Sequence, residues 1–244
     1  LQRCQVGLQA GNHADFTLAE LDPPARLVPT RVLQGRSAAL RLLDEALART
    51  AFERIEAVFV SGSSGMGKSA LVQAFVRRQG DHVVMAHGKF EALGGSVPYG
   101  ALRQALKELV EIGQSLAAGF AERLVEALDG NAVVLTDVSP ELSAWLGPQP
   151  PVVELPPQQA EQRFDDAMIT LLLAFASGAR PLLLWLDDLQ WADSASLRLI
   201  ERLLSRGDQG AVLLVATHRE EQLAGSALEQ LSAATRVRTL SLGP

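Results

Sequence analysis

The sequence contains a single cysteine, Cys4, and no group of Cys and His at zinc-binding spacing. An internal disulfide is therefore excluded, and a reducing, cytoplasmic setting is expected. Long apolar runs are also missing, because the most apolar stretches, 168–176 and 181–186, are shorter than the roughly 20 residues that span a bilayer. No signal-peptide pattern is present, and the chain starts at Leu1 rather than Met, so we expect an excerpt of a longer protein.

Basic residues are also fewer than acidic residues. The 22 Lys and Arg against 28 Asp and Glu give a net charge of -6, with a pI near 5.3. A broad nucleic-acid footprint requires clustered Lys and Arg, so this class of function is disfavoured. The compact basic pair Arg77-Arg78 fits the solvated end of a helix better than a binding patch.

The length of 244 residues, 48% of them hydrophobic, suits one large α/β domain, or one domain with an appendage. Residues 1–30 include Pro23-Pro24 and Pro29 and are expected to be a linker or the tail of a preceding domain. Residues 31–244 are expected to form the domain proper.

Apolar periodicity in this region predicts helices alternating with strands. Helices are predicted at 37–50, 68–79, 100–116, 161–177, 194–205 and 226–233, and strands at 57–61, 82–86, 182–186, 211–217 and 236–242. Residues 117–157 carry little periodicity, and only short helices are expected there. The alternation predicts an α/β fold, a three-layer αβα sandwich around a mainly parallel sheet.

The most informative motif fits the pattern G-x-x-x-x-G-K-[ST] and lies between a predicted strand and a predicted helix. Its glycines let backbone N–H groups converge on phosphate oxygens, Lys68 can reach the β- and γ-phosphates, and Ser69 can bind Mg²⁺. A chance match to a glycine-rich turn is the alternative. The residues predicted to bind the nucleotide here are Gly62, Ser63, Ser64, Gly65, Met66, Gly67, Lys68, Ser69 and Ala70.

A second motif is the acidic pair that ends the apolar run 182–186. A central parallel strand would deliver these carboxylates to the carboxyl edge of the sheet, where the phosphate loop also lies. Asp187 is predicted to hold Mg²⁺ and Asp188 to polarise the attacking water. The alternative interpretation is that the pair caps the following helix.

The motifs together resemble the nucleotide-binding domain of STAND-type signalling ATPases, in the branch described as Orc1-like AAA ATPase domains with a P-loop NTPase fold. The nearest match is the module between a kinase-like domain and GAF and histidine-kinase modules in large bacterial hybrid sensor proteins. The resemblance covers roughly 16–244. It is carried by LQGR at 33–36, GSSGMGKSALV at 62–72, GKFEALGGSVPYGAL at 88–102, LLLWLDDLQWAD at 182–193 and LLVATHRE at 213–220.

The resemblance implies further roles. Gly35 and Arg36 would lie near the adenine, and Arg219 would lie near the γ-phosphate as a sensor, where a guanidinium can bind phosphate bidentately. An ordinary surface salt bridge is the alternative for Arg219. Trp191 fits packing better than nucleotide contact.

Three departures from the family pattern matter. The acidic pair is Asp-Asp where many AAA enzymes carry Asp-Glu, so slow hydrolysis is expected. No arginine finger can be assigned, since Arg202 and Arg206 are more simply solvated charges at a helix end. The sequence stops at Pro244, where such proteins continue into helical and winged-helix segments that close over the nucleotide, so we expect the closure residues to lie outside it.

The leading hypothesis is a cytoplasmic switch that binds ATP and Mg²⁺, turns ATP over slowly, and biases neighbouring signalling domains in the same chain. ATP and ADP are the expected ligands, and self-association that depends on the nucleotide is a further hypothesis. Any protein kinase activity would reside in other domains. The alternatives are an ATP-dependent transcriptional regulator or Orc1-like DNA-associated ATPase, and a small-molecule P-loop kinase.

Overall fold

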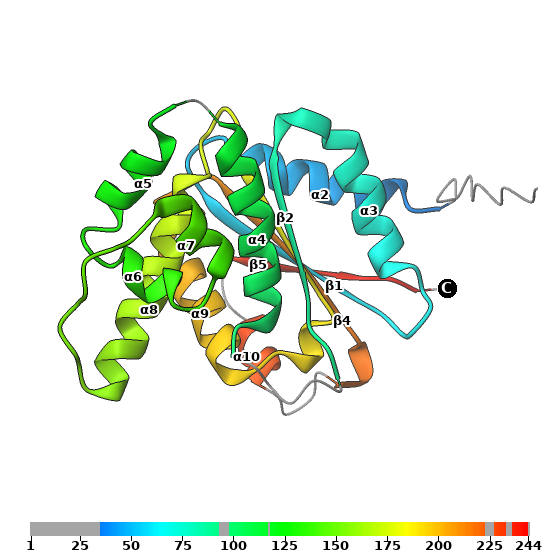
Figure 1. Ribbon diagram of the computed structural model, residues 1–244. Coiled ribbons are helices and arrows are strands. Elements are labelled where there is room, and N and C mark those ends of the chain that lie inside the picture. The colour runs from blue at the N-terminus through cyan, green and yellow to red at the C-terminus, as the bar shows by residue number, and fades with distance from the viewer. Residues whose placement is uncertain (1–34, 93–97, 117, 223–226, 233–235, 244) are drawn as a thin grey trace, which may run out of the picture. The chain divides into compact units, whose positions relative to one another are not determined.

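Five parallel strands form one sheet in the computed structural model, which describes residues 35–92, 98–116, 118–222, 227–232 and 236–243 (Figure 1). The strands lie in the order β2 (Val84–Lys89), β3 (Leu182–Asp187), β4 (Val212–His218), β1 (Ile55–Ser61) and β5 (Val237–Ser241). The expected α/β fold with a parallel central sheet is confirmed. The predicted linker, residues 1–30, lies outside the described residues.

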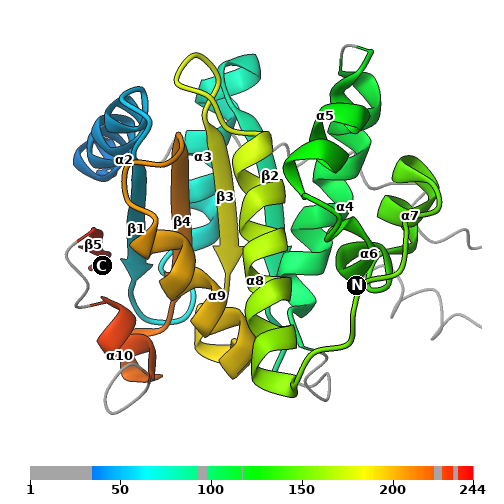
Figure 2. The same ribbon diagram turned by 90° about the vertical axis from the view of Figure 1, so that its left-hand side faces the viewer.

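Helices cover both faces of this sheet, which makes the three layers (Figure 2). On one face lie α8 (Pro157–Ala174) and α9 (Ser194–Ser205), and on the other lie α2 (Ser37–Thr50) and α3 (Lys68–Gln79). Because strand side chains alternate between faces, Phe59 and Leu184 join the core under α8 and α9, whereas Val58 and Leu183 point to the other layer. The central strands are buried on both faces, which explains their unbroken apolar sequences.

The edge of the sheet that β2 forms is covered by α4 (Gly100–Ser115). Two side chains of α4 replace a neighbouring strand: the backbone N–H of His87 donates to Glu108 at 2.7 Å, and that of Lys89 donates to Gln104 at 2.8 Å. Covering an edge in this way satisfies donors that would otherwise be open to a further strand. The arrangement also fixes the end of β2, where Lys89 lies.

The region of weak periodicity contains three short helices that extend the core beyond α4 and α8. Each helix contributes one fully buried leucine to the same apolar cluster, namely Leu124, Leu135 and Leu142. The helices are α5 (Phe120–Ala127), α6 (Ala132–Thr136) and α7 (Pro140–Leu146). Their shortness explains the weak periodic signal, because helices of five to eight residues make little more than two turns.

Most predicted elements lie within a few residues of their expected places. The strand predicted at 82–86 lies instead at Val84–Lys89, and the helix predicted at 161–177 begins earlier, at Pro157. The remaining helix, α10 (Ala227–Ser232), matches the described part of its prediction. Single turns lie at Gly80–His82 (η1), Leu189–Trp191 (η2) and Glu220–Gln222 (η3). None of the described helices combines the length and apolarity needed to cross a membrane.

Candidate functional site

The strand ends bring the predicted site residues to one edge of the sheet. In the parallel register Ser61 lies opposite His218, and Lys89 lies opposite Asp187. The loop after β1, the acidic pair after β3 and the segment after β4 therefore leave the sheet at the same level. The carboxyl edge of an open parallel sheet is the usual place for ligand binding in α/β folds.

The loop between β1 and α3 has the backbone that converging N–H groups require. Gly65 and Gly67 adopt left-handed conformations with φ of +81° and +82°, which a residue with a side chain rarely adopts. No side chain caps α3, so the first backbone N–H groups of this helix donate to no capping side chain and point toward the loop. An anion at this position would be bound by N–H groups and by the positive end of the helix.

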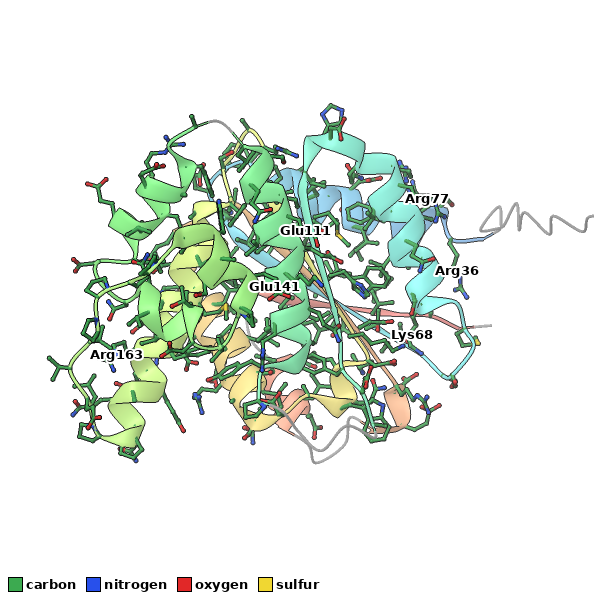
Figure 3. All side chains as sticks on the ribbon, in the orientation of Figure 1. Arg36, Lys68, Arg77, Glu111, Glu141 and Arg163 are labelled. Atoms are coloured by element: carbon green, nitrogen blue, oxygen red, sulfur yellow. The ribbon has the colours of Figure 1, made fainter. Side chains whose placement is uncertain are left out.

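Lys68 lies inside the loop. Its side chain is buried, with 8% of the residue exposed, and Nζ donates to the carbonyls of Gly62 at 2.7 Å and Ser63 at 2.9 Å. These contacts hold the ammonium group at the start of the loop. Figure 3 shows Lys68 at the lower end of α3, and Arg77 farther up the same helix.

Arg36 connects the loop to the chain that leaves β5. Its guanidinium donates to the Met66 carbonyl at 3.3 Å and to the Gly243 carbonyl at 2.9 Å. Gly62 lies against the same exit segment, because a Cβ on Gly62 would stand 2.8 Å from the Leu242 carbonyl oxygen. The structure thus brings Arg36 to the phosphate loop, while its predicted adenine contact stays a prediction.

Asp187 is buried beside the start of α3. The Ser69 hydroxyl donates to it, with Oγ 3.1 and 3.2 Å from the two carboxylate oxygens. The Thr217 hydroxyl at the end of β4 also donates to the Asp187 carboxylate. The hydroxyl oxygen of Thr217 in turn accepts a hydrogen bond from the backbone N–H of Asp188 at 3.1 Å. Thr217 therefore joins the two members of the acidic pair to the neighbouring strand.

The Asp188 carboxylate is held by two side chains. Lys89 Nζ lies 3.0 Å from it, and Gln190 Nε2 donates to it at 3.1 Å. Burial opposes ionisation of Asp188, but these two hydrogen bonds, supported by the charges of Lys89 and Arg219, keep its pKa below the usual value. The backbone at Asp188 is left-handed, with φ of 58°. Asp188 is thus an ionised carboxylate already engaged with a cation.

The structure bears on the capping and salt-bridge alternatives. Asp193 caps α9, accepting from the Ser196 N–H at 2.9 Å, so neither member of the acidic pair caps that helix. Asp188 stands at the N-cap position of the single turn η2, but its side chain accepts no capping hydrogen bond there. Among the described residues the Arg219 guanidinium makes no ion pair, and its backbone N–H donates to Gln190 at 3.1 Å.

Three other side chains considered in the sequence can now be placed. Arg202 and Arg206 both pair with Asp166 of α8, at 2.7 and 2.6 Å, so they are packed ionic contacts rather than freely solvated charges. Trp191 is 39% exposed, so most of its surface is packed against the protein, and its preference for packing over nucleotide contact stays a prediction. The sequence therefore misjudged the surroundings of the two arginines.

Sequence reasoning missed Lys89 and Thr217. The strand predicted at 82–86 ends three residues before Lys89, and the Gly88-Lys89 dipeptide is untypical of a strand. Its register opposite Asp187 is visible only once β2 pairs with β3. Thr217 was assigned to a strand correctly, but its contact with Asp187 depends on the adjacency of β3 and β4.

The residues at this edge fit a phosphate and a magnesium ion. Ser69 and Asp187 offer a hydroxyl and a carboxylate within hydrogen-bond distance of each other, and Mg²⁺ is usually held by one or two protein oxygens together with phosphate and water. The loop supplies N–H groups and one ammonium group for the phosphate. The chemistry of the donor set therefore agrees with a magnesium nucleotide.

Comparison with protein families matches residues 32–215 to the AAA ATPase domain. Hybrid signal transduction histidine kinase G of Dictyostelium discoideum is 34% identical over 194 residues, which are 78% of this chain and 6% of that protein. The chain thus spans only a small part of the length of this curated relative.

Two solved structures are similar at low identity. Cdc6p from Pyrobaculum aerophilum aligns with 91% of this chain and 48% of its own, with 15% identity and a TM-score of 0.49. A solved ATPase aligns with 78% of this chain and 66% of its own, with 13% identity and a TM-score of 0.32.

Proposed function

This chain belongs to the AAA ATPase domain family, and from that premise we propose that it binds ATP with Mg²⁺, hydrolyses it slowly, and acts as a regulatory switch within a signalling protein. The observation that carries the proposal is the meeting of Lys68, Ser69 and Asp187 at the carboxyl edge of the sheet.

Each of these residues has a distinct task in the proposal. The N–H groups of the loop and of the start of α3 bind the phosphates, and Lys68 binds the β- and γ-phosphates. Ser69 and Asp187 hold Mg²⁺, which when bound neutralises phosphate charge. Arg219, with no ion pair among the described residues, is suited to bind the γ-phosphate.

Slow hydrolysis is supported by the state of Asp188. A carboxylate that accepts hydrogen bonds from Lys89 and Gln190, and whose pKa is depressed, is a weaker base for the attacking water than a free one. The side chain of Asp188 is also one methylene group shorter than that of glutamate. A misplacement of about 1 Å can cost on the order of 100-fold in rate.

The regulatory role rests on the relative. The protein from Dictyostelium discoideum is by name a hybrid signal transduction histidine kinase, and the matching region is 6% of it, so most of that chain lies outside the match. We propose that ATP and ADP are the ligands of this domain, that neighbouring signalling domains in a cytoplasmic chain respond to them, and that self-association depends on the nucleotide. A DNA-associated ATPase or transcriptional regulator is the alternative, which the net charge of -6 disfavours.

The proposal is tested by thermal unfolding with and without ATP and Mg²⁺. A ligand at 100 times its Kd that binds only the folded state adds about 2.7 kcal/mol, which corresponds to a shift of roughly 5–10 °C in Tm for a chain of this size. We expect this shift for the wild type and its loss in Lys68→Ala.

The matched control is Arg77→Ala, which removes an exposed cation from the same helix, away from the loop. It should retain the full shift. Equal shifts in the wild type and Lys68→Ala would overturn the assignment of the loop, as would the absence of any shift in the wild type.

A further inference from the structure

The segments that follow β3 and β4 are joined by the side chain of Gln190. This half-buried residue lies in η2, the single turn after the acidic pair. The backbone of Asp188 is left-handed, with φ of 58°, so the chain turns sharply there and the Gln190 amide returns to the Asp188 carboxylate. The other end of the amide reaches the backbone of Arg219, the first residue after β4. One amide group therefore contacts both strand exits.

The two hydrogen bonds of this amide depend on each other. The Arg219 N–H donates to Oε1 of Gln190 at 3.1 Å, and Nε2 of Gln190 donates to Oδ1 of Asp188 at 3.1 Å. A backbone N–H needs an acceptor and an ionised carboxylate needs a donor, so only this orientation of the amide satisfies both. Rotation of the amide by half a turn would break both bonds at once. A planar, rigid group thus connects the Arg219 backbone with the Asp188 carboxylate.

Gln190 is one of two side chains that orient this carboxylate. Lys89 Nζ lies 3.0 Å from Oδ2, so each carboxylate oxygen has a separate partner. Lys89 belongs to β2, whereas Gln190 connects the carboxylate to the segment after β4. A shift of the Arg219 backbone would therefore act on the carboxylate through Gln190.

We propose that Gln190 is a positioning residue for ATP hydrolysis: its amide makes the orientation of the Asp188 carboxylate depend on the position of Arg219. This inference rests on the proposed function, in which Arg219 binds the γ-phosphate and Asp188 acts on the attacking water. A displacement of Arg219 on binding the γ-phosphate then reaches Asp188 through two hydrogen bonds. Gln190 acts through Asp188 and needs no contact with the nucleotide.

Loss of the amide has two opposing effects on Asp188. Without the bond from Nε2 the carboxylate is a stronger base, but one hydrogen bond changes the basicity by about ten-fold at most, and only part of this gain reaches the rate. The carboxylate is also free to turn, and a misplacement of about 1 Å can cost on the order of 100-fold in rate. Misplacement is the larger effect, so hydrolysis should become slower.

The test compares single-turnover hydrolysis with ATP affinity in Gln190→Met, which keeps the length of the side chain and removes both hydrogen bonds. We expect the rate to fall about ten-fold while the Kd for ATP with Mg²⁺ changes less than about two-fold. A faster rate would overturn the proposal, because the bond would then only weaken the base. A large loss of affinity would overturn it as well, since Gln190 would then maintain the whole site.

The matched control is Gln79→Met. The Gln79 amide also donates to a carboxylate, that of Asp44 at 3.0 Å, but it lies at the end of α3 away from the phosphate loop. This variant loses a hydrogen bond of the same kind and should hydrolyse ATP at the wild-type rate. An equal fall in both variants would point to a general loss of structure and overturn the role of Gln190.

A double-mutant cycle tests the connection to Arg219. Arg219→Ala keeps the backbone N–H that Gln190 binds but removes the guanidinium, so the amide has no displacement to transmit. The rate of the double variant Arg219→Ala with Gln190→Met should exceed the value for independent losses by about three-fold or more. Independent losses that simply multiply would overturn the coupling.

The outcomes separate this inference from the proposed function. A wild type that binds no ATP, or that binds ATP without hydrolysing it, overturns both. A wild type that hydrolyses ATP no faster than Gln190→Met overturns only the role of Gln190.

Discussion

At the scale of single residues, the two neighbouring aspartates differ in their surroundings. Asp187 is buried and accepts hydrogen bonds from two hydroxyl groups, those of Ser69 and Thr217. Asp188 is instead held by an ammonium group and an amide, those of Lys89 at 3.0 Å and Gln190 at 3.1 Å, whereas Lys89 Nζ lies 3.8 Å from Asp187. Two hydroxyl partners suit a carboxylate that holds a metal ion, whereas a carboxylate near solvent suits contact with water. We therefore propose different roles for these two chemically identical side chains.

The difference predicts separable effects of two isosteric substitutions. Asp188→Asn should leave ATP affinity nearly intact and lower single-turnover hydrolysis by on the order of 10- to 100-fold, because it removes the base and keeps the shape. Asp187→Asn should instead weaken the Mg²⁺-dependent part of binding. Rapid-quench hydrolysis and calorimetric affinities measure both. Hydrolysis by Asp188→Asn at the wild-type rate would show that Asp188 does not act on water.

At the scale of elements, β2 shows how closely the sheet edge is packed. A Cβ at Gly88 would lie 1.9 Å from the Ala101 carbonyl oxygen and 2.6 Å from its carbon, both backbone atoms of α4. Only glycine lets the strand approach the helix this closely. The contact fixes β2 against α4, and thereby fixes Lys89 one residue later.

Gly88→Ala should therefore destabilise the protein by about 1–3 kcal/mol or more, the usual cost of overpacking, because the backbone of α4 must shift. Urea unfolding measures the change. Gly100→Ala is the matched control, since a Cβ there meets no atom within 4 Å and alanine favours a helix. Equal stability of the two variants would contradict the close approach.

The elements also show what the sequence could and could not predict. The helix at 37–50 and the strand at 182–187 carry strong local patterns and lie where expected. The strand β2 was displaced because Gly88 and Lys89 disfavour a strand locally, while pairing with β3 and two side chains of α4 hold them in one. The loop and the acidic pair were visible as motifs. Lys89 was not, because its role depends on the order of strands in the sheet.

At the scale of the whole molecule, stability should depend on pH through His218. This side chain is fully buried at the end of β4, and its Nε2 has no hydrogen-bond partner among the described residues. Burial lowers the pKa of His218 below its ordinary value of 6.5, and the charge of Lys68 lowers it further. The Arg219 carbonyl and the charge of Glu220 act in the opposite direction.

A depressed histidine pKa means that the unfolded chain takes up the proton first as the pH falls. The contribution of His218 is therefore complete above about pH 6.5 and is lost below it, by at most about 1.4 kcal/mol per pH unit. Urea unfolding at pH 7.5 and 5.5 should show this loss in the wild type and a smaller one in His218→Gln. His82→Gln, at an exposed position, should behave as the wild type, and identical pH profiles for all three would contradict the role of His218.

The close contact between Gly62 and Leu242 has a mechanical consequence. A methyl group on Gly62 has no room beside the Leu242 carbonyl, and the Arg36 guanidinium bridges Met66 and Gly243. The loop therefore cannot move toward the chain that leaves β5 without displacing it. Tension on that chain beyond Gly243 is likewise transmitted to the loop through Arg36, and to the end of β1 through the hydrogen bond that the Leu242 N–H donates to the Ser61 carbonyl at 2.9 Å. A force on the chain where it leaves β5 would therefore act directly on the phosphate loop.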